Sequence, residues 1–215
     1  MTYDQGVIEA FRALPTPSVS DALVQLGSPG TMEAEIKPVV TGKLVGPAVT
    51  VLEERAEGAG PPTHAIEAID SAAAGSVIVI SVERARDVAV WGGLMTAGAA
   101  ARGVAGAVLD GSARDVEEIE RDFGMPIYAR GASPNSTVGT YRTVAHGVPV
   151  ECGGVQVTPG DLVVADRDGV VVVPAALVAE TLVAAQEIEK REQQTTERIK
   201  ALGSLGAAVA ESNRI

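Results

Sequence analysis

The sequence contains few of the residues on which several common chemistries depend. It has one cysteine and two histidines in 215 residues. A single cysteine, Cys152, excludes an intramolecular disulfide framework and is typical of a reducing cytoplasm. Neither His64 nor His146 lies in a recognisable nucleophile motif, which argues against a Ser-His-Asp hydrolase. We therefore expect a cytoplasmic protein that relies on neither disulfides nor that kind of catalysis.

Positive charge and long apolar segments are also scarce. The chain has 17 Lys and Arg residues against 28 Asp and Glu residues, a formal net charge of −11, and no basic cluster. This balance argues against a nucleic-acid-binding surface. The sequence has no stretch of 18 apolar residues and no signal-like N-terminus, so we expect neither membrane insertion nor export. It also has no glycine-rich phosphate loop of the Walker or dinucleotide type.

The remaining composition is that of a folded α/β domain. Hydrophobic residues make up 46% of the chain and aromatic residues only 3%, so the core consists mainly of Val, Ala, Leu and Ile. No proline- or serine-rich linker divides the sequence, which predicts one compact domain over residues 1–215.

The middle of the chain alternates between buried strands and helices. We expect five elements that alternate between strand and helix, beginning with a strand, at Val77–Val82, Gly92–Arg102, Val104–Leu109, Asp115–Phe123 and Pro126–Ala129. The first, third and fifth are apolar strands, and Asp110-Gly111 is expected to form a turn. Strands separated by helices at this spacing predict a parallel sheet with right-handed crossovers.

Both ends of the chain carry further elements. Ser18 is a good N-cap for a helix over Val19–Leu26. After Pro174, a long helix is expected from Ala175 to about Leu202. Three short strands precede it and predict an antiparallel meander, at Val155–Thr158, Leu162–Ala165 and Val170–Val173.

One stretch brings a glycine pair, an arginine and two carboxylates near successive strand ends. Gly93 is followed by twenty residues, then Arg114, Asp115, two further residues and Glu118. Backbone N–H groups and an arginine bind anions, and carboxylates bind hard cations. In open α/β sheets, ligands bind at the carboxyl edge of the strands. This inventory suits a metal-assisted reaction on a small carboxylic acid.

Each part of this pattern has a purely structural alternative. Asp115 with Glu118 at i+3 resembles a capping box, in which the two side chains only stabilise a helix start. Arg114 is then a surface arginine, and Gly92-Gly93 simply permits close helix packing. Elsewhere, His64 and Glu67 share a helical face and form either a metal-binding pair or a surface pair.

The same residues resemble the motif of the RraA-like family, which includes class II 4-hydroxy-4-methyl-2-oxoglutarate/4-carboxy-4-hydroxy-2-oxoadipate aldolases. The family motif is Gly, twenty residues, Arg-Asp, two residues, then Glu or Asp, and this chain matches it without a gap. The resemblance implies a swivelling β/β/α fold with parallel core strands, an antiparallel meander and a long C-terminal helix. It extends to the segments Ser18–Leu23, Val45–Val51, Tyr128–Gly131 with Ser133-Pro134, and Pro159–Pro174.

The resemblance also implies roles for single residues. Arg114 takes the place of the substrate-binding arginine, Asp115 that of the metal-binding aspartate, and Glu118 that of a carboxylate holding water around the metal. All three are expected catalytic residues. The substrate-contacting stretch falls on Gly92, Gly93, Leu94 and Met95. Some aldolases have an asparagine near Pro61–His64, where this chain has none. The resemblance therefore does not identify the aldehyde or ketone half of the substrate.

By this resemblance the chain is a pyruvate-releasing aldolase that uses Mg²⁺ or Mn²⁺ and decarboxylates oxaloacetate through the same enolate. The family forms homotrimers, some paired into hexamers, with sites between subunits, and a glutamate from a neighbouring C-terminal helix approaches the site. Either Glu192 or Glu197 is its counterpart here. The alternative is a non-catalytic regulator that binds a ribonuclease or helicase, and such members depart in the acidic part of the motif. A methyltransferase has no support, because a glycine-rich cofactor loop is missing.

Overall fold

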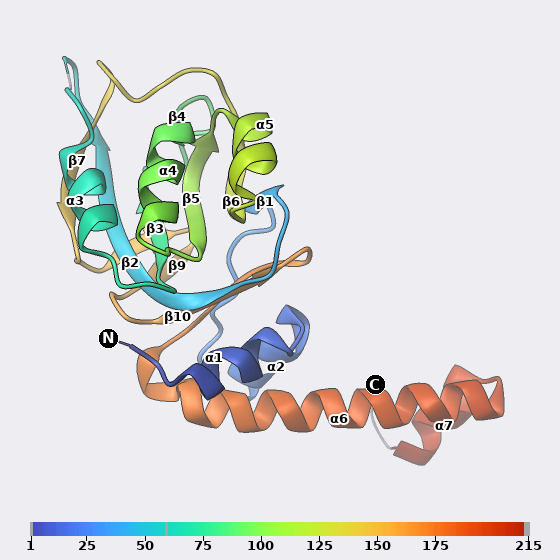
Figure 1. Ribbon diagram of the computed structural model, residues 1–215. Helices are drawn as coiled ribbons and strands as arrows, with labels where there is room; N and C mark the ends of the chain where they lie inside the picture. Colours follow the sequence, from blue (N-terminus) through green and yellow to red (C-terminus); the bar gives the residue numbers. More distant parts are fainter. Residues whose placement is uncertain (1, 59, 213–215) are drawn as a thin grey trace.

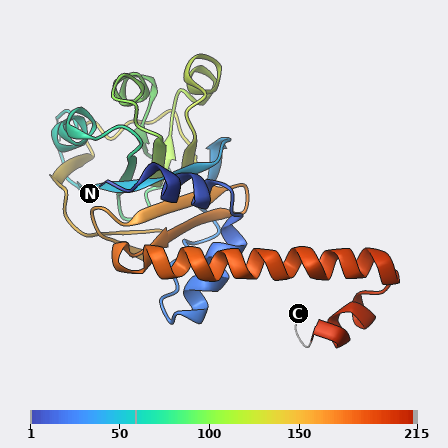
Figure 2. The ribbon, with the colours of Figure 1, turned by 60° about the horizontal axis from the view of Figure 1, so that its bottom comes forward.

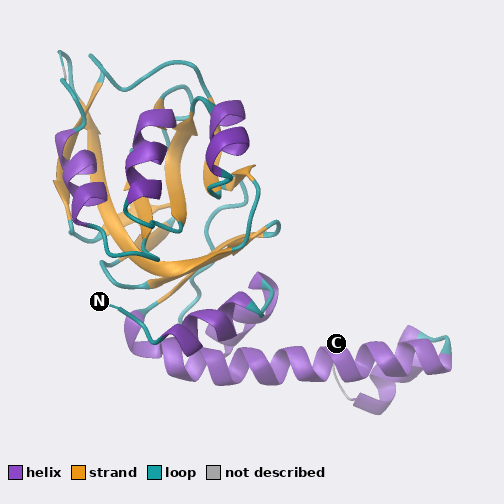
Figure 3. Cartoon of the chain, viewed as in Figure 1, coloured by secondary structure: helices purple, strands orange, loops and turns teal. Residues whose placement is uncertain are grey.

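A nine-stranded mixed sheet forms the centre of the computed structural model, which describes residues 2–58 and 60–212 (Figures 1 and 3). The strand order is β1-β6-β5-β3-β2-β10-β11, with β4 paired to β5 and β7 paired to β2. The strands are β1 Lys37–Val40, β2 Leu44–Arg55, β3 Val77–Ser81, β4 Ala89–Trp91, β5 Gly106–Ala113, β6 Ile127–Ala132, β7 Tyr141–His146, β10 Leu162–Asp166 and β11 Gly169–Val173. A separate hairpin joins β8 Val150–Cys152 to β9 Val155–Val157.

The parallel part of the sheet confirms the alternation that the sequence predicts. Strands β2, β3, β5 and β6 run parallel, and the strands at the centre are buried along their whole length. Figure 1 shows α3, α4 and α5 side by side on one face of this sheet. These helices are α3 Thr63–Ser71, α4 Gly93–Ala101 and α5 Val116–Glu118, the last continuing as a π-helix over Ile119–Phe123. Gly103 adopts a left-handed conformation (φ 71°) just after α4, as predicted for a helix end.

The long strand β2 links the parallel and antiparallel parts of the sheet. Its first residues pair antiparallel with β10, its middle pairs parallel with β3, and its end pairs antiparallel with β7. The sheet therefore curves, and apolar side chains pack on both of its faces. One core lies beneath α3 and α4, a second lies inside the curved sheet, and a third lies between β10–β11 and the helices of the two chain ends.

Four helices from the two ends of the chain lie below the sheet in Figure 1. They are α1 Gln5–Arg12, α2 Thr16–Gln25, α6 Val178–Leu202 and α7 Leu205–Ser212. The predicted long helix is confirmed, although its first turn, Ala175–Leu177, is a 3₁₀-helix. All buried residues of α6 lie between Val178 and Ile188, and its second half extends beyond the body of the molecule (Figure 2). Helix α7 then turns back along α6.

The expected turn at Asp110-Gly111 is wrong, because both residues continue strand β5. Asp110 is 4% exposed, and its Oδ1 accepts hydrogen bonds from Arg130 Nη2 at 2.6 Å and from the Gly153 N–H at 3.1 Å. A Cβ on Gly111 would lie 2.8 Å from Val82 Cγ1, so this glycine permits close packing. An Asp-Gly pair indicates a turn only where the aspartate has no buried partner, and here Arg130 pairs with it.

Two further expectations need correction. Ser18 caps no helix, because α2 already begins at Thr16 with Pro15 as its N-cap, and the Ser18 hydroxyl instead donates to Glu189 of α6 at 3.1 Å. The predicted three-strand meander is only partly right. Strands β10 and β11 do pair antiparallel, but β9 pairs with β8 and β10 lies beside β2. The place beside β10 that was expected for β9 is therefore taken by β2, a strand more than a hundred residues earlier.

Candidate active site

The ends of strands β4 and β5 bring the two halves of the glycine–arginine–carboxylate motif together. The two strands pair in parallel, and the Arg114 N–H donates to the Trp91 carbonyl at 2.9 Å. Gly92 therefore follows β4 directly beside the point where Arg114 and Asp115 follow β5. The prediction that both segments lie just after strand ends, at helix N-termini, is confirmed.

The Asp115 carboxylate points toward helix α4 and away from its own helix. Asp115 adopts a left-handed backbone (φ 58°, ψ 30°), and its Oδ2 accepts a hydrogen bond from the Gly93 N–H at 3.0 Å. It makes no side-chain hydrogen bond to the N-terminus of α5. The capping-box alternative is therefore wrong for Asp115. The carboxylate instead bonds to one of the N–H groups that lack intrahelical partners at the start of α4.

The two glycines make the space that the charged side chains occupy. A Cβ on Gly92 would lie 2.8 Å from Asp115 Oδ2 and 3.1 Å from Arg114 Cγ. A Cβ on Gly93 would lie 2.8 Å from Glu118 Oε1. Real Cβ atoms do not approach other atoms this closely, so larger residues would displace both carboxylates. The glycine pair thus leaves open the space in which the carboxylates of Asp115 and Glu118 lie.

Arg114 lies between this carboxylate pair and a pocket. Its Nε is 3.6 Å from Asp115 Oδ2, and the two side chains are 44% and 40% exposed. An ion pair this exposed contributes little to stability. Its exposed guanidinium keeps donors available for a bound anion, because the single contact to Asp115 uses only part of its planar fork.

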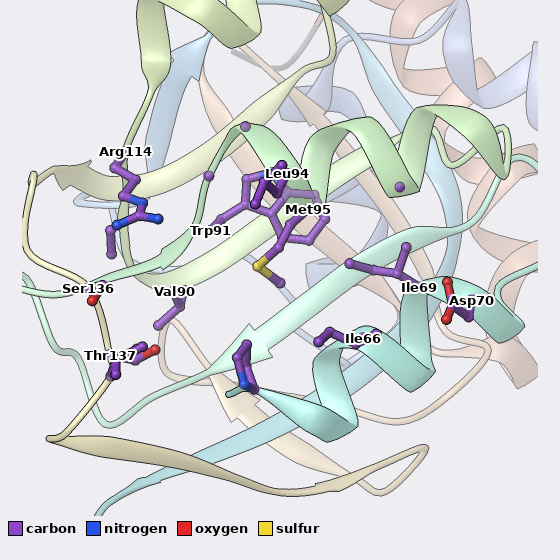
Figure 4. A pocket seen from close by; sticks show the side chains of 16 residues that line it. Ile66, Ile69, Asp70, Val90, Trp91, Leu94, Met95, Arg114, Ser136 and Thr137 are labelled. Atoms are coloured by element: carbon purple, nitrogen blue, oxygen red, sulfur yellow. The ribbon is translucent and has the colours of Figure 1, made fainter. Parts of the chain in front are cut away.

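A pocket of about 370 Å³ opens beside Arg114, between α3, α4, β4 and the segment 136–138 (Figure 4). The expected substrate-contacting residues Gly92, Gly93, Leu94, Met95 and Arg114 all line it. The Leu94 side chain is 90% exposed and lies at the rim. Asp115 and Glu118 lie next to the two glycines and do not themselves line the pocket. Sequence reasoning did not identify the rest of the lining, which comprises Pro62, Ile66, Ile69, Asp70, Ala89, Val90, Trp91, Gly98, Ser136, Thr137 and Val138.

The donor set fits a cation that keeps most of its water. Within residues 2–58 and 60–210, no three His, Cys, Asp or Glu side chains are grouped to hold a metal ion. Asp115 and Glu118 are both exposed carboxylates, and the cradle formed by Gly92 and Gly93 holds them at one edge of the pocket. Mg²⁺ characteristically binds through one or two carboxylates and several waters. The residues present therefore fit such an ion, with Asp115 as the expected protein ligand.

The second suggested metal pair is not formed. The His64 ring nitrogen Nδ1 lies 3.3 Å from Thr143 Oγ1, whereas Glu67 lies 3.7 Å from His146 Nε2. The two histidine rings are 6.2 Å apart at their centres. His64 and Glu67 therefore contact different partners on β7, so the expected pairing of these two residues, as a metal site or as a surface pair, is not what the structure shows.

The structure is a mixed α/β domain in which a glycine pair, an arginine and two carboxylates meet beside a pocket, and comparisons identify the family. The sequence model of the RraA-like family, described as Aldolase/RraA, matches residues 16–172, and the chain belongs to this family. The chain is 34% identical over 200 residues to a Halalkalibacterium halodurans protein named "Putative 4-hydroxy-4-methyl-2-oxoglutarate aldolase". The aligned region covers 91% of this chain and 88% of that protein.

Solved structures agree with this assignment. The crystal structure of a protein from Pseudomonas syringae pv. tomato str. DC3000 has a TM-score of 0.89 at 34% identity, over 98% of this chain and 96% of that one. Streptomyces coelicolor RraAS2 is described as an unusual member of the RNase ES inhibitor RraA protein family. It has a TM-score of 0.84 at 28% identity, over 91% of this chain and 99% of that one. The family thus joins proteins named as aldolases to proteins named as ribonuclease inhibitors.

The described residues hold no helix that is long and apolar enough to cross a membrane.

Proposed function

We propose that this chain is a divalent-metal-dependent aldolase that cleaves a 4-hydroxy-2-oxo acid and releases pyruvate. The observation that carries the proposal is the grouping of Arg114, Asp115 and Glu118 around Gly92 and Gly93 at the edge of a pocket. This edge offers donors for a substrate carboxylate and carboxylates for a cation. The relative named as an aldolase of 4-hydroxy-4-methyl-2-oxoglutarate supports the substrate class.

Some residues of the chain bind the substrate carboxylate, and others hold the cation that stabilises the enolate. The Arg114 guanidinium binds the substrate carboxylate through its planar fork of donors. N–H groups of Leu94 and Met95, in the first turn of α4, complete the anion site. Asp115 would hold Mg²⁺ or Mn²⁺, and Glu118 would hold water around it. When bound, the cation supplies positive charge that stabilises a developing enolate.

The reaction requires no other cofactor. The C3–C4 bond breaks, and its electron pair passes into the enolate of pyruvate. The C4 hydroxyl loses its proton and becomes the carbonyl of the second product, while C3 gains a proton to complete pyruvate. Glu118, exposed beside Gly93, is a carboxylate of this chain that is placed to exchange protons with water at this edge. Decarboxylation of oxaloacetate forms the same enolate, so we expect it as a second activity.

The site is open on one side, and we propose that a neighbouring subunit closes it. Leu94 is 90% exposed at the rim, and the second half of α6 extends away from the body (Figures 1 and 2). Glu192 and Glu197 lie on this exposed half. A homotrimer or hexamer in which α6 reaches a neighbour would place one of these carboxylates near Arg114 of another chain.

A screen of 2-oxo acids tests this function. Pyruvate release from 4-hydroxy-2-oxo acids and from oxaloacetate is measured with Mg²⁺, with Mn²⁺ and with EDTA. We expect release with either metal and its loss in EDTA. If no 2-oxo acid reacts with either metal, the aldolase proposal is wrong.

The second candidate function is a regulator that binds a ribonuclease or helicase, and the similarity to RraAS2 favours it. The complete Arg114-Asp115-x-x-Glu118 motif favours the enzyme, because a binding surface has no need for a carboxylate pair held beside two glycines. A pull-down with candidate ribonucleases and helicases, run beside an oxaloacetate assay on the same preparation, separates the two functions.

A further inference from the structure

The pocket next to Arg114 carries only one positive charge. Of the 16 residues that line it, all within the described chain, Arg114 is the only cation and Asp70 the only anion. Figure 4 shows these two at opposite ends of the pocket, with Val90, Met95, Ile66 and Ile69 labelled between them. Arg114 can therefore bind one carboxylate at its own end. A second carboxylate in the pocket would have no cationic side chain beside it among the lining residues of this chain.

The wall between the two ends is apolar and offers few polar groups. Trp91 is 1% exposed, and its indole N–H already donates to Thr96 Oγ1 at 2.8 Å. The indole therefore offers no free N–H donor to a ligand in the pocket. Ile66 on α3 and Val138 on the opposite side remain 45% and 63% exposed, so apolar side chains also form the rim.

The pocket is larger than the pyruvate part of a substrate requires. Its volume of about 370 Å³ falls within the range of pockets that hold whole small-molecule ligands. Pyruvate, held at Arg114 and the start of α4, would fill only the end nearest those residues. The remaining space, along Val90, Met95 and Ile69, then receives the substituent on C4 of the substrate.

We propose that this substituent is apolar and uncharged, so that the chain cleaves 4-hydroxy-2-oxo acids whose leaving half is an alkyl or aryl aldehyde or ketone. This inference rests on the proposed function. A C4 carboxylate would lose part of its hydration against Ile66, Ile69 and Met95 without gaining a cation from these side chains, and burial of an unpaired charge is costly. It would also approach Asp70, which has the same charge. An alkyl or aryl group instead gains free energy from burial against the same side chains.

The chemistry of the cleavage is unchanged by this choice of substituent. The C3–C4 bond breaks, its electrons form the pyruvate enolate, and the C4 hydroxyl proton leaves as the apolar carbonyl product forms. Protonation of C3 then completes pyruvate, so no oxidant or reductant is needed.

Two pairs of matched compounds test the inference. The reactive pair is 4-hydroxy-4-methyl-2-oxoglutarate and the analogue in which an isopropyl group replaces its C4 carboxylate. We expect kcat/KM to be roughly tenfold or more higher for the isopropyl compound, because its substituent needs no counter-charge. The non-reactive pair is 2-oxoglutarate and 5-methyl-2-oxohexanoate, which lack the C4 hydroxyl. Their binding is followed by the fluorescence of Trp91, the sole tryptophan of the sequence. We expect 5-methyl-2-oxohexanoate to bind more tightly.

A variant that adds a positive charge to the pocket provides a second test. Ile66→Lys places a cation on the exposed rim of the pocket, where a helix surface tolerates lysine, and should shift both preferences toward the dicarboxylates by about tenfold. Val24→Lys is the matched control, because Val24 is 60% exposed on α2 and lies outside the pocket lining. It should leave both preferences unchanged.

The outcomes separate this inference from the proposed function. Preference of the unmodified protein for the dicarboxylates, or preferences that Ile66→Lys does not change, would overturn the apolar assignment even if pyruvate is released. If neither reactive compound is cleaved but 5-methyl-2-oxohexanoate binds more tightly than 2-oxoglutarate, the proposed reaction fails and the assignment of an apolar ligand stands.

Discussion

At the scale of single residues, the backbone of Asp115 explains how its carboxylate reaches α4. A left-handed conformation is rare outside glycine, and Asp and Asn are the residues that tolerate it best. Such a conformation persists where its surroundings hold it, and here the Gly93 N–H bonds the Asp115 carboxylate while the Ile119 N–H bonds its carbonyl. Asparagine is therefore the replacement that preserves this backbone while removing the negative charge.

Arg114→Lys should reduce turnover by roughly two orders of magnitude, on the scale of losing one oxyanion donor. Lysine keeps the charge but loses the two-pronged fork that binds a carboxylate. Steady-state kinetics of pyruvate release measure the effect, and oxalate, which resembles the planar pyruvate enolate, should compete less well in the variant. Arg12→Lys is the matched control, because Arg12 lies 3.7 Å from Glu9 and is 45% exposed, almost as Arg114 is. A loss smaller than about threefold, far below that scale, would show that Arg114 is only a surface residue.

Gly93→Ala should leave the fold intact and lower activity by about ten- to a hundredfold, the range expected when a catalytic group is misplaced by about 1 Å. The helical backbone accepts alanine, but the added Cβ would lie 2.8 Å from Glu118 Oε1 and displace that carboxylate. Activity and melting temperature are measured together.

Gly206→Ala in α7 serves as the control for this substitution, since a Cβ there meets no described atom within 4 Å. If Gly93→Ala keeps full activity while remaining folded, the space beside Gly93 is not needed by the site.

At the scale of elements, strand β2 contains a carboxylate with no partner. Glu53 is 1% exposed, and neither of its oxygens has a hydrogen-bond partner among the residues that the structure describes. Burial raises the pKa of Glu53 from its ordinary value of 4.5 to about 7. Between these two values the folded state binds the proton more tightly than the unfolded state, so stability falls as the pH rises through this window and stays reduced above it.

Glu53→Gln should therefore stabilise the protein at pH 8 and have much less effect at pH 5, because an amide stays neutral where the buried carboxyl must ionise. A shift of this size corresponds to up to about 3 kcal/mol at the higher pH. Denaturant unfolding at both pH values measures the difference. Glu54→Gln is the control, as the neighbouring Glu54 side chain is 45% exposed. An equal effect of Glu53→Gln at pH 5 and pH 8 would contradict the account.

The elements that sequence could predict are those fixed by local patterns. Val77–Val82 and Gly92–Arg102 were identifiable because their apolar runs and bounding glycines lie within a few residues of one another. The candidate site residues Gly93, Arg114 and Asp115 were identifiable for a related reason, since each lies within two residues of a strand end. Their meeting at one edge follows from the parallel pairing of neighbouring strands.

The remaining features depend on partners far along the chain. Asp110 lies in a strand because it pairs with Arg130 and with the Gly153 N–H, neither of which a local pattern reveals. The apolar side of the pocket is formed where Ile66 of α3 faces the segment around Val138, which an isolated bridge between Ala89 and Ser136 holds beside β4. Neither segment carries a motif, so only the folded chain shows that they share a pocket.

At the scale of the whole molecule, we expect the extended half of α6 to contact a neighbouring subunit. Removal of residues 191–215 should leave the body folded, because the Ser18–Glu189 hydrogen bond and the buried residues of α6 all precede the cut. We expect the unmodified protein to be a trimer or a multiple of it by light scattering. The shortened chain should lose this assembly and most of its activity. An active monomer at assay concentration, or full activity of the shortened chain, would rule out a site shared between subunits.

We expect the cleavage to depend on a divalent cation held by Asp115, and add-back of Mg²⁺ to metal-free protein tests this dependence. Pyruvate release from a 4-hydroxy-2-oxo acid is followed in the unmodified protein and in Asp115→Asn while Mg²⁺ is added back after EDTA treatment. We expect activity of the unmodified protein to disappear in EDTA and to return with Mg²⁺. The folded Asp115→Asn variant should stay inactive at every Mg²⁺ concentration. Full activity of Asp115→Asn, or activity of the unmodified protein that persists in EDTA, would contradict this dependence.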